Sequence, residues 1–285
     1  KQLANYLMVP AISMLAVFMG MQDFMKPDKT HLAGKFKTMN DAYLLEAKKI
    51  GQALPVSMPP RFFDLIFNIE PINIVFTSEY FLPENEQEFF DEKFVLVGAD
   101  SYQRLEDTSN FPIERLKKAK KVLYVSFGTI FGDYAKEIYT KVFEAFSDTD
   151  YLVVLAAHQV SLKDLAIPKN FIVQDYLPQN EVLKYADVAI THNGLNSMND
   201  LILNDVPFVS LPMGSDQPAL AYRLVELKAA ICLDYQQVSS DELKAAVENV
   251  QINPSYLSNL KHIKQSFLAA GGYKKAADAI EDYLN

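Results

Sequence analysis

Short apolar runs alternate with amphipathic stretches from Lys121 to the end of the chain. Runs of about four to six apolar residues are typical of strands buried in a parallel sheet, and apolar positions three or four residues apart are typical of the helices that cover it. The predicted strands are Val122–Ser126, Tyr151–Leu155, Phe171–Gln174, Val188–Thr191, Phe208–Leu211 and Ala230–Leu233. Six strands joined by crossover segments predict a Rossmann-like α/β domain.

Helical periodicity fills the segments between these strands and continues beyond the last one. Ser240, followed by Leu243 and Val247, predicts a helix N-cap and an apolar stripe. Gly271-Gly272 precedes a final helix, which we expect to pack back on the first domain. The predicted helices are Tyr134–Ala145, Asn180–Tyr185, Asn196–Leu203, Pro218–Leu227, Ser240–Val250, Ser255–Ala270 and Tyr273–Tyr283.

The pattern before Lys121 is less regular. Met39–Ala53 has charged and apolar faces and predicts a helix. The stretch 98–120 is polar, contains Pro112 and lacks apolar periodicity until Ile113, so it predicts a linker. We therefore expect an N-terminal domain over 1–98, a linker over 99–120 and a C-terminal domain over 121–285. Strands are predicted upstream at Val9–Met14, Ile72–Thr77 and Phe94–Val97.

Composition narrows the class of partner. The formal net charge of −9 argues against a nucleic acid or an anionic membrane, and the short basic stretch Lys117–Lys121 is interpreted as solvated linker. Cys232 is the single cysteine, so a reduced, cytoplasmic setting is expected. The apolar stretch Leu7–Met21 is interrupted by Pro10 and lacks a cleavage site, so we interpret it as core rather than signal peptide. Because the chain opens on Lys, we expect it to begin inside a longer gene product.

Polar residues gather in three loops that follow predicted strands. Loops at the carboxyl ends of parallel strands line one crevice, so these residues would converge on one ligand. Three such clusters in order predict a nucleotide-sugar site. The clusters are Tyr176-Leu177-Pro178-Gln179, His192-Asn193-Gly194-Leu195-Asn196-Ser197 and Asp216-Gln217.

The second cluster opens a predicted helix. The backbone N–H groups and the positive end of a helix bind pyrophosphate, and the His192 imidazole and Ser197 hydroxyl would add donors. A structural alternative makes Asn196 or Ser197 the helix N-cap. Upstream, Gly128 would let a phosphate approach the backbone and Thr129 would add a hydroxyl, although a tight turn also explains the glycine.

The remaining candidates suit the other parts of such a ligand. Tyr176 offers a ring to stack on a base, and Gln179 offers an amide to read its edge. Asp200 would accept hydrogen bonds from a ribose diol, and Asp216 with Gln217 would contact hexose hydroxyls. The structural alternatives are packing for the tyrosine, a favourable helix-dipole contact for Asp200 and an N-cap for Asp216.

Together these residues resemble the family 1 glycosyltransferases of GT-B fold, in particular the bacterial macrolide-type UDP-glycosyltransferases. Three further segments look like landmarks of that family: Ile72-Asn73-Ile74-Val75, Phe94-Val95-Leu96-Val97-Gly98 and Val125-Ser126-Phe127-Gly128-Thr129. The resemblance implies two Rossmann-like domains. It also implies inverting transfer of a hexose from a UDP-sugar to a hydroxyl of a small hydrophobic acceptor, such as a macrolide or flavonoid, without a cofactor or metal.

The resemblance also implies roles for single residues. Tyr176 would stack on uracil, Gln179 would contact the base or ribose, Asp200 would hold the ribose, and Asp216 with Gln217 would contact the sugar. The residues implied to bind phosphates are His192, Gly194, Asn196 and Ser197. Four positions depart from the usual Trp, Gly, Glu and Gly of the family: Tyr176, Asn193, Asp200 and His158.

The family's general base, a histidine in a Gly-His segment near the start of the N-terminal domain, has no counterpart before Lys121. His31 follows no first strand and is not assigned that role. The N-terminal domain is therefore expected to lack about three βα units, roughly 90 to 110 residues. Two alternatives remain. In the first, the enzyme is split and a separate chain supplies the missing units and the acceptor site. In the second, the protein is a non-catalytic nucleotide-binding relative of the family.

Overall fold

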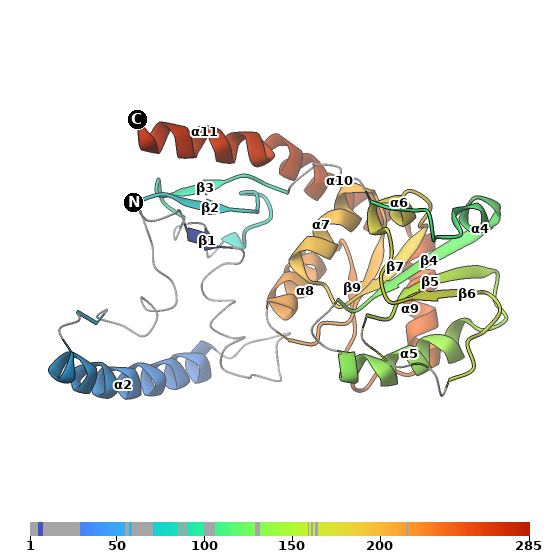
Figure 1. Ribbon diagram of the computed structural model, residues 1–285, viewed down its shortest axis with the longest axis horizontal. Coiled ribbons are helices and arrows are strands. Elements are labelled where there is room, and N and C mark those ends of the chain that lie inside the picture. Colours follow the sequence, from blue (N-terminus) through green and yellow to red (C-terminus); the bar gives the residue numbers. More distant parts are fainter. Residues whose placement is uncertain are drawn as a thin grey trace.

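The computed structural model describes residues 5–7, 29–54, 57–58, 71–84, 87, 90–99, 106–128, 132–158, 160, 162, 165–214 and 216–285. For residues 5–7, 29–36, 39 and 132–135 it describes the backbone alone. The described chain forms two parallel sheets with helices packed on them (Figure 1). The predicted α/β fold is confirmed.

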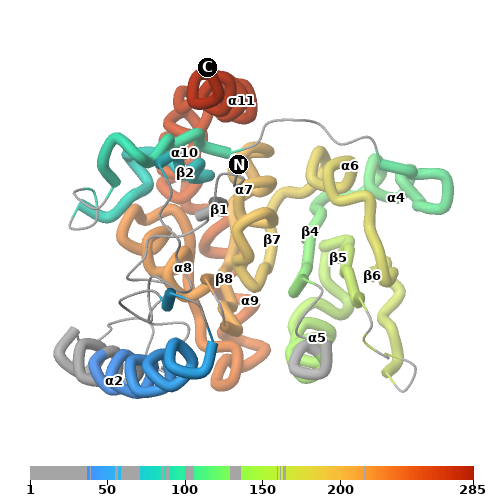
Figure 2. The backbone as a smooth tube through the Cα atoms, turned by 60° about the vertical axis from the view of Figure 1, so that its left-hand side comes forward, coloured from blue at the N-terminus to red at the C-terminus, as the bar shows by residue number. Residues whose placement is uncertain are grey.

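The larger sheet has six parallel strands in the order β6-β5-β4-β7-β8-β9. Its chain runs outward from β4 to β5 and β6, and then returns to the other side of β4 as β7 (Figure 2). Such a reversal leaves a crevice at the carboxyl ends of the two central strands. The strands are β4 (Lys121–Ser126), β5 (Tyr151–Ala156), β6 (Phe171–Gln174), β7 (Val188–Thr191), β8 (Phe208–Ser210) and β9 (Ile231–Cys232).

Helices cover both faces of this sheet because the strands are apolar on both sides. One face carries α5 (Gly132–Phe146) and α9 (Ser240–Ile252), whose buried residues share a core cluster with β4 and β5. The other face carries the remaining helices of this region, which share a second cluster. These are α6 (Gln179–Leu183), α7 (Leu195–Leu203), α8 (Gln217–Glu226) and α10 (Pro254–Ala269). At α9 the N-cap is Ser239 rather than the predicted Ser240, because Ser239 forms a capping box with Glu242.

The smaller sheet has three parallel strands in the order β1-β2-β3. Its last two strands lie within the predicted ones, whereas β1 precedes the predicted strand Val9–Met14, which lies outside the described residues. Helix α2 (Lys29–Ala53) extends the predicted helix toward the N-terminus. None of the described helices is long and apolar enough to cross a membrane. The strands are β1 (Asn5–Leu7), β2 (Asn73–Val75) and β3 (Phe94–Leu96).

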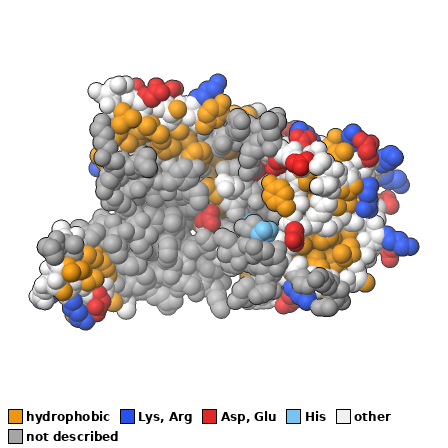
Figure 3. Space-filling view, viewed as in Figure 1, with side chains coloured by type: hydrophobic (Ala, Val, Ile, Leu, Met, Phe, Trp, Pro, Cys, Tyr) orange, Lys and Arg blue, Asp and Glu red, His pale blue; other side chains and the backbone are white. Residues whose placement is uncertain are grey.

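The final helix, α11 (Gly272–Leu284), returns to the smaller sheet (Figure 1). Its Ala276 shares a buried cluster with Ile74 and Val97, and the Gly272 amide donates to the Val97 carbonyl at 2.7 Å. Apolar side chains are also exposed along this part of the surface (Figure 3). Helix α11 therefore connects the end of the chain to the N-terminal sheet.

The stretch predicted as a linker contains a helix, α4 (Ile113–Lys118). Leu116 on this helix is buried in the core of the larger sheet, and Arg115 donates to the carbonyls of Lys169 and Phe171. One helical turn and a half is too short for a sequence periodicity to reveal. The second half of this stretch is therefore packed on the larger sheet.

Candidate functional site

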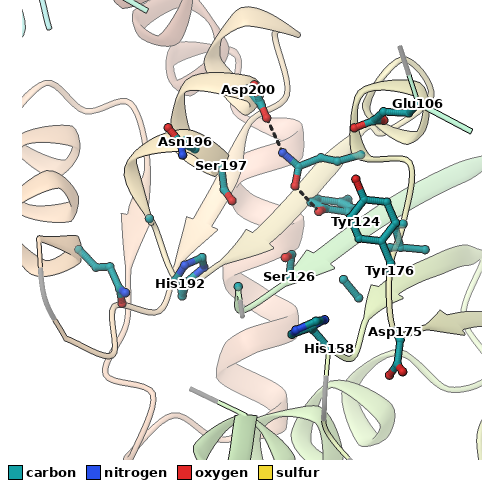
Figure 4. Close-up of a pocket in the computed structure, with 16 residues that line it drawn as sticks. Glu106, Tyr124, Ser126, His158, Asp175, Tyr176, His192, Asn196, Ser197 and Asp200 are labelled. Carbon is teal, nitrogen blue, oxygen red and sulfur yellow. Dashed lines mark hydrogen bonds between the residues drawn. The ribbon is translucent and has the colours of Figure 1, made fainter. Parts of the chain in front are cut away.

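A cavity of about 310 Å³ lies at the carboxyl ends of β4 to β7 (Figure 4). Its walls come from the loops after these strands, from the first turns of α6 and α7 and from the start of α8. This is the crevice at which the strand order reverses. The predicted site residues that line it are Gly128, Tyr176, Gln179, His192, Gly194, Asn196, Ser197, Asp200 and Gln217.

Of the other two predicted site residues, one is described and does not line the cavity. Asp216 occupies the N-cap position of α8, although its side chain makes no capping hydrogen bond. Thr129 lies outside the described residues. Next to Asp216, the Gln217 side-chain oxygen accepts hydrogen bonds from the amides of Met213 and Gly214 at 2.8 and 3.2 Å. Gln217 therefore also holds the loop before α8 in place.

His192 is buried between two glycines at the floor of the cavity. A Cβ on Gly128 or on Gly194 would lie 2.6 Å from its Nε2, so both positions need glycine to make room for the imidazole. The Nδ1 atom is buried and has no hydrogen-bond partner among the described residues. Burial lowers the pKa of His192, with partial opposition from the Ser126 backbone and the Asp216 carboxylate. The imidazole is therefore neutral near pH 7 and acts as a hydrogen-bonding group.

Helix α7 points its N-terminus at the same cavity. Gly194 is its N-cap, with extended backbone and no side-chain cap, and the first intrahelical bond runs from the Met198 amide to the Gly194 carbonyl at 2.9 Å. Asn196 and Ser197 therefore lie inside the first turn, and the structural alternative that made one of them the N-cap is wrong. The amides of a first turn have no acceptor within the helix, so they suit an anion.

Asn193 does not line the cavity, although it stands between two residues that do. It adopts a left-handed conformation, with φ of 67°, which asparagine tolerates better than most residues. Its side chain is fully buried, donates to the Gln217 carbonyl at 3.3 Å and accepts from the Ser210 hydroxyl at 3.2 Å. The amide thus points away from the ligand space and ties the loop after β7 to β8 and α8.

Gln179 and Asp200 are joined by a hydrogen bond across the cavity wall. The Gln179 Nε2 donates to Asp200 Oδ2 at 2.5 Å, and the Tyr124 hydroxyl donates to Gln179 Oε1 at 2.7 Å (Figure 4). Tyr176 stands at the rim and is 72% exposed, so its ring face is accessible to a ligand.

Several lining residues were missed by the sequence analysis as candidates. Glu106 comes from the stretch interpreted as a linker, and its carboxylate accepts from the Asn180 amide at the start of α6 at 2.8 Å. Tyr124 was missed because it lies inside a strand rather than in a loop, and His158 appeared only as a departure from a family pattern. Ala156 and Asp175, which adjoin strand ends, were also missed, whereas Ser126 and Leu177 lie in predicted segments but were given no role of their own.

Comparison with known proteins gives a consistent result. Residues 112–266 match the family described as "UDP-glucoronosyl and UDP-glucosyl transferase". The chain is 36% identical over 228 residues to an uncharacterized UDP-glucosyltransferase, YdhE, of Bacillus subtilis. That alignment covers 79% of this chain and 56% of YdhE. A second Bacillus subtilis protein, the uncharacterized UDP-glucosyltransferase YojK, is 33% identical over 98% of this chain and 69% of its own length.

Solved structures resemble the fold as well. The crystal structure of the glycosyltransferase of kitacinnamycin superposes with a TM-score of 0.64 at 29% identity, over 77% of this chain and 56% of that one. The chain thus spans little more than half the length of this structure and of YdhE. The region matched by the family, 112–266, contains every cavity residue except Glu106.

Proposed function

Because the chain belongs to the UDP-glucuronosyl and UDP-glucosyl transferase family, we propose that its cavity binds the nucleoside diphosphate of a UDP-sugar for transfer of the sugar. The supporting observation is that several hydrogen-bond donors converge on the cavity. The N-terminal amides of α7, the neutral His192 imidazole and the Ser197 hydroxyl face a single cavity. Such donors bind a diphosphate without needing a charged side chain.

We assign the parts of the ligand to successive walls of the cavity. Tyr176 stacks on the uracil at the rim, and Asp200 accepts from the ribose hydroxyls. The diphosphate lies on the first turn of α7, beside His192. Gln217 and the neighbouring Asp216 lie toward the transferred hexose, on the side of α8.

The proposed reaction is a displacement with inversion. An acceptor hydroxyl oxygen attacks the anomeric carbon, the bond from that carbon to the β-phosphate oxygen breaks, and UDP leaves with its electron pair. The acceptor proton passes to a general base, for which we assign no residue of this chain. The α7 amides and His192 stabilise the charge that develops on UDP, in place of a metal ion.

The finer parts of the function are also proposals. We propose that the acceptor is a small hydrophobic alcohol or phenol, that no cofactor is needed and that the protein works in the cytoplasm. A completing N-terminal segment or a separate chain would supply the acceptor site and the base.

Calorimetric titration with UDP, and then with UDP-glucose, tests the proposal. The chain should bind both, and His192→Ala should weaken UDP by about 10- to 100-fold because it removes a hydrogen bond to a charged group. His262→Ala, on the exposed side of α10, is the matched control and should leave the affinity unchanged. A folded wild-type chain that binds neither ligand contradicts the proposal. Binding without transfer, when the acceptor half is supplied, would favour a non-catalytic nucleotide-binding protein.

A further inference from the structure

Tyr124, Gln179 and Asp200, from three different elements, form a chain of hydrogen bonds along the cavity wall, which we call the row. Tyr124 on β4 donates to Gln179 at the start of α6, and Gln179 donates to Asp200 on α7 (Figure 4). Asp200 is assigned above to the ribose, and the family resemblance also implies a contact of Gln179 with the base or ribose, whereas Tyr124 has no role so far. Tyr124 itself is 2% exposed and is the most buried of the three.

The row has a fixed polarity. A tyrosine hydroxyl can donate or accept, and an amide can present either its oxygen or its nitrogen. Reversing the Gln179 amide would turn its oxygen toward the Asp200 carboxylate, and two acceptors would then repel each other. Burial raises the pKa of Tyr124, so its hydroxyl keeps its proton and remains a donor over the physiological range. The Asp200 carboxylate therefore fixes which end of the Gln179 amide faces it, and the Tyr124 hydroxyl donates to the other end and holds it in place.

The Tyr124 hydroxyl is not explained by packing. Tyr124 belongs to the buried apolar cluster on one face of the larger sheet, and a phenylalanine would fill the same core space. A buried hydroxyl is costly to place in an apolar core unless it has a partner. Its partner here is a residue that lines the ligand cavity, rather than a structural backbone group.

We propose that Tyr124 is a positioning residue that makes this site select ribonucleotides over 2′-deoxyribonucleotides. Its hydroxyl anchors the Gln179 amide, which in turn holds the Asp200 carboxylate toward the ribose hydroxyls. This inference rests on the proposed function, because it requires that the cavity bind a nucleoside diphosphate. A carboxylate held in one geometry distinguishes a sugar with a 2′-hydroxyl from one without it, whereas a mobile carboxylate adapts to both.

The experiment compares the affinities of UDP and 2′-deoxy-UDP, which differ by one oxygen atom. The wild-type chain should prefer UDP by roughly tenfold, the value of one hydrogen bond to a charged acceptor. Tyr124→Phe should weaken UDP and leave 2′-deoxy-UDP nearly unchanged, so that the ratio of the two dissociation constants falls toward one. Both are measured by calorimetry on the full chain.

Tyr151→Phe is the matched control. Tyr151 is also buried and is the first residue of β5 in the same sheet. Its hydroxyl donates to the side-chain oxygen of Gln251 at 2.6 Å, so it makes the same kind of hydrogen bond, but away from the cavity. This variant should keep the wild-type ratio. Gln179→Met removes the middle of the row at a half-buried position and should lower the ratio as Tyr124→Phe does.

The outcomes separate this inference from the proposed function. A wild-type chain that binds UDP, with an unchanged ratio in Tyr124→Phe and in Gln179→Met, overturns the role of Tyr124 and leaves the proposed function in place. Equal weakening of both ligands also overturns it, because a general structural defect would have that effect. A wild-type chain that binds neither nucleotide overturns both.

Discussion

The two parallel sheets of this protein differ in how they are held together. The six-stranded sheet is enclosed by two large apolar clusters, one on each face. The three-stranded sheet has strands of three residues, and its two clusters contain few buried side chains among the described residues. Among the described residues, the larger sheet carries its own core, while the smaller one is joined to the rest of the chain by a few contacts.

Several of those contacts join the turn after β2 to helices α8 and α10. The turn after β2 inserts Phe81 into the core of the larger sheet, with its ring 5.4 Å from that of Phe267. Arg223 on α8 donates to the carbonyls of Tyr80, Phe81 and Leu82 at 2.9 to 3.1 Å. The turn is thus bound to the same helix that begins beside the ligand cavity. The comparison teaches that, among the described residues, contacts with the larger sheet help to position the smaller one.

The largest effect should come from the larger core. Phe208 is fully buried in it, and Phe208→Ala should lower the free energy of unfolding by about 3–5 kcal/mol because it leaves a cavity. Val75 is equally buried in the smaller sheet, but Val75→Ala should lower it by only about 1–2 kcal/mol. Urea unfolding measures both. Equal losses would mean that the two sheets share one core.

The junction between the sheets should be the next most sensitive place. A Cβ on Gly98 would lie 2.0 Å from the Phe267 carbonyl oxygen, and its φ is 75°. Gly98→Ala should therefore cost about 3 kcal/mol, through the clash and the backbone strain. Gly272 has φ of 62° but a nearest contact of 3.7 Å, so Gly272→Ala should cost about 1 kcal/mol. Thermal unfolding of the two variants would contradict this interpretation if the order were reversed.

Arg223 tests whether the turn after β2 is held by its hydrogen bonds. Arg223→Ala leaves three backbone carbonyls without this donor and should cost about 2 kcal/mol, mostly as local opening of the turn. Hydrogen exchange at the amides of Phe81 and Leu82 measures that opening. Arg115→Ala, which removes two carbonyl contacts within the larger sheet, is the control and should leave those amides protected. Unchanged exchange in Arg223→Ala would mean that Phe81 alone anchors the turn.

The smallest expected effect is the loss of folding stability that His192 causes at acidic pH. The pKa of His192 is lowered from 6.5 in the folded protein, so below that pH the unfolded chain binds more protons than the folded one. The contribution of His192 to stability is therefore complete above pH 6.5 and declines as the pH falls toward its folded pKa. His192→Gln should reduce the loss of stability between pH 7.5 and 5.5, and His262→Gln should not. Urea unfolding at pH 7.5 and 5.5 measures the loss of free energy of unfolding. An equal loss in the wild type and in His192→Gln would contradict the burial effect.

The sequence predicts the larger sheet well because its signals are local. The bounds of β6 and β7 agree with the predicted strands at both ends, since each is a short apolar run between polar residues. The cavity was also accessible to sequence reasoning, because loops at the carboxyl ends of parallel strands must meet. Nine of the predicted residues, Tyr176 and His192 among them, line it together.

The parts that were missed depend on contacts between distant residues. Nothing near Glu106 in the sequence shows that it reaches α6, and nothing near Tyr124 shows that its hydroxyl meets Gln179 across 55 positions. Asn193 was treated as a departure within a phosphate loop, whereas its left-handed backbone turns the side chain inward. Sequence periodicity locates elements, but it does not say which side chain bridges them.

The buried setting of Asn193 has a consequence for chemical ageing. An asparagine followed by glycine deamidates readily in a flexible chain, because the glycine amide nitrogen attacks the side-chain carbonyl to close a succinimide ring. Here the Asn193 amide is held by the Gln217 carbonyl and the Ser210 hydroxyl and is shielded from water, so it is not free to turn toward the Gly194 nitrogen. The rate at which Asn193 deamidates is therefore set by how often the loop after β7 opens to water.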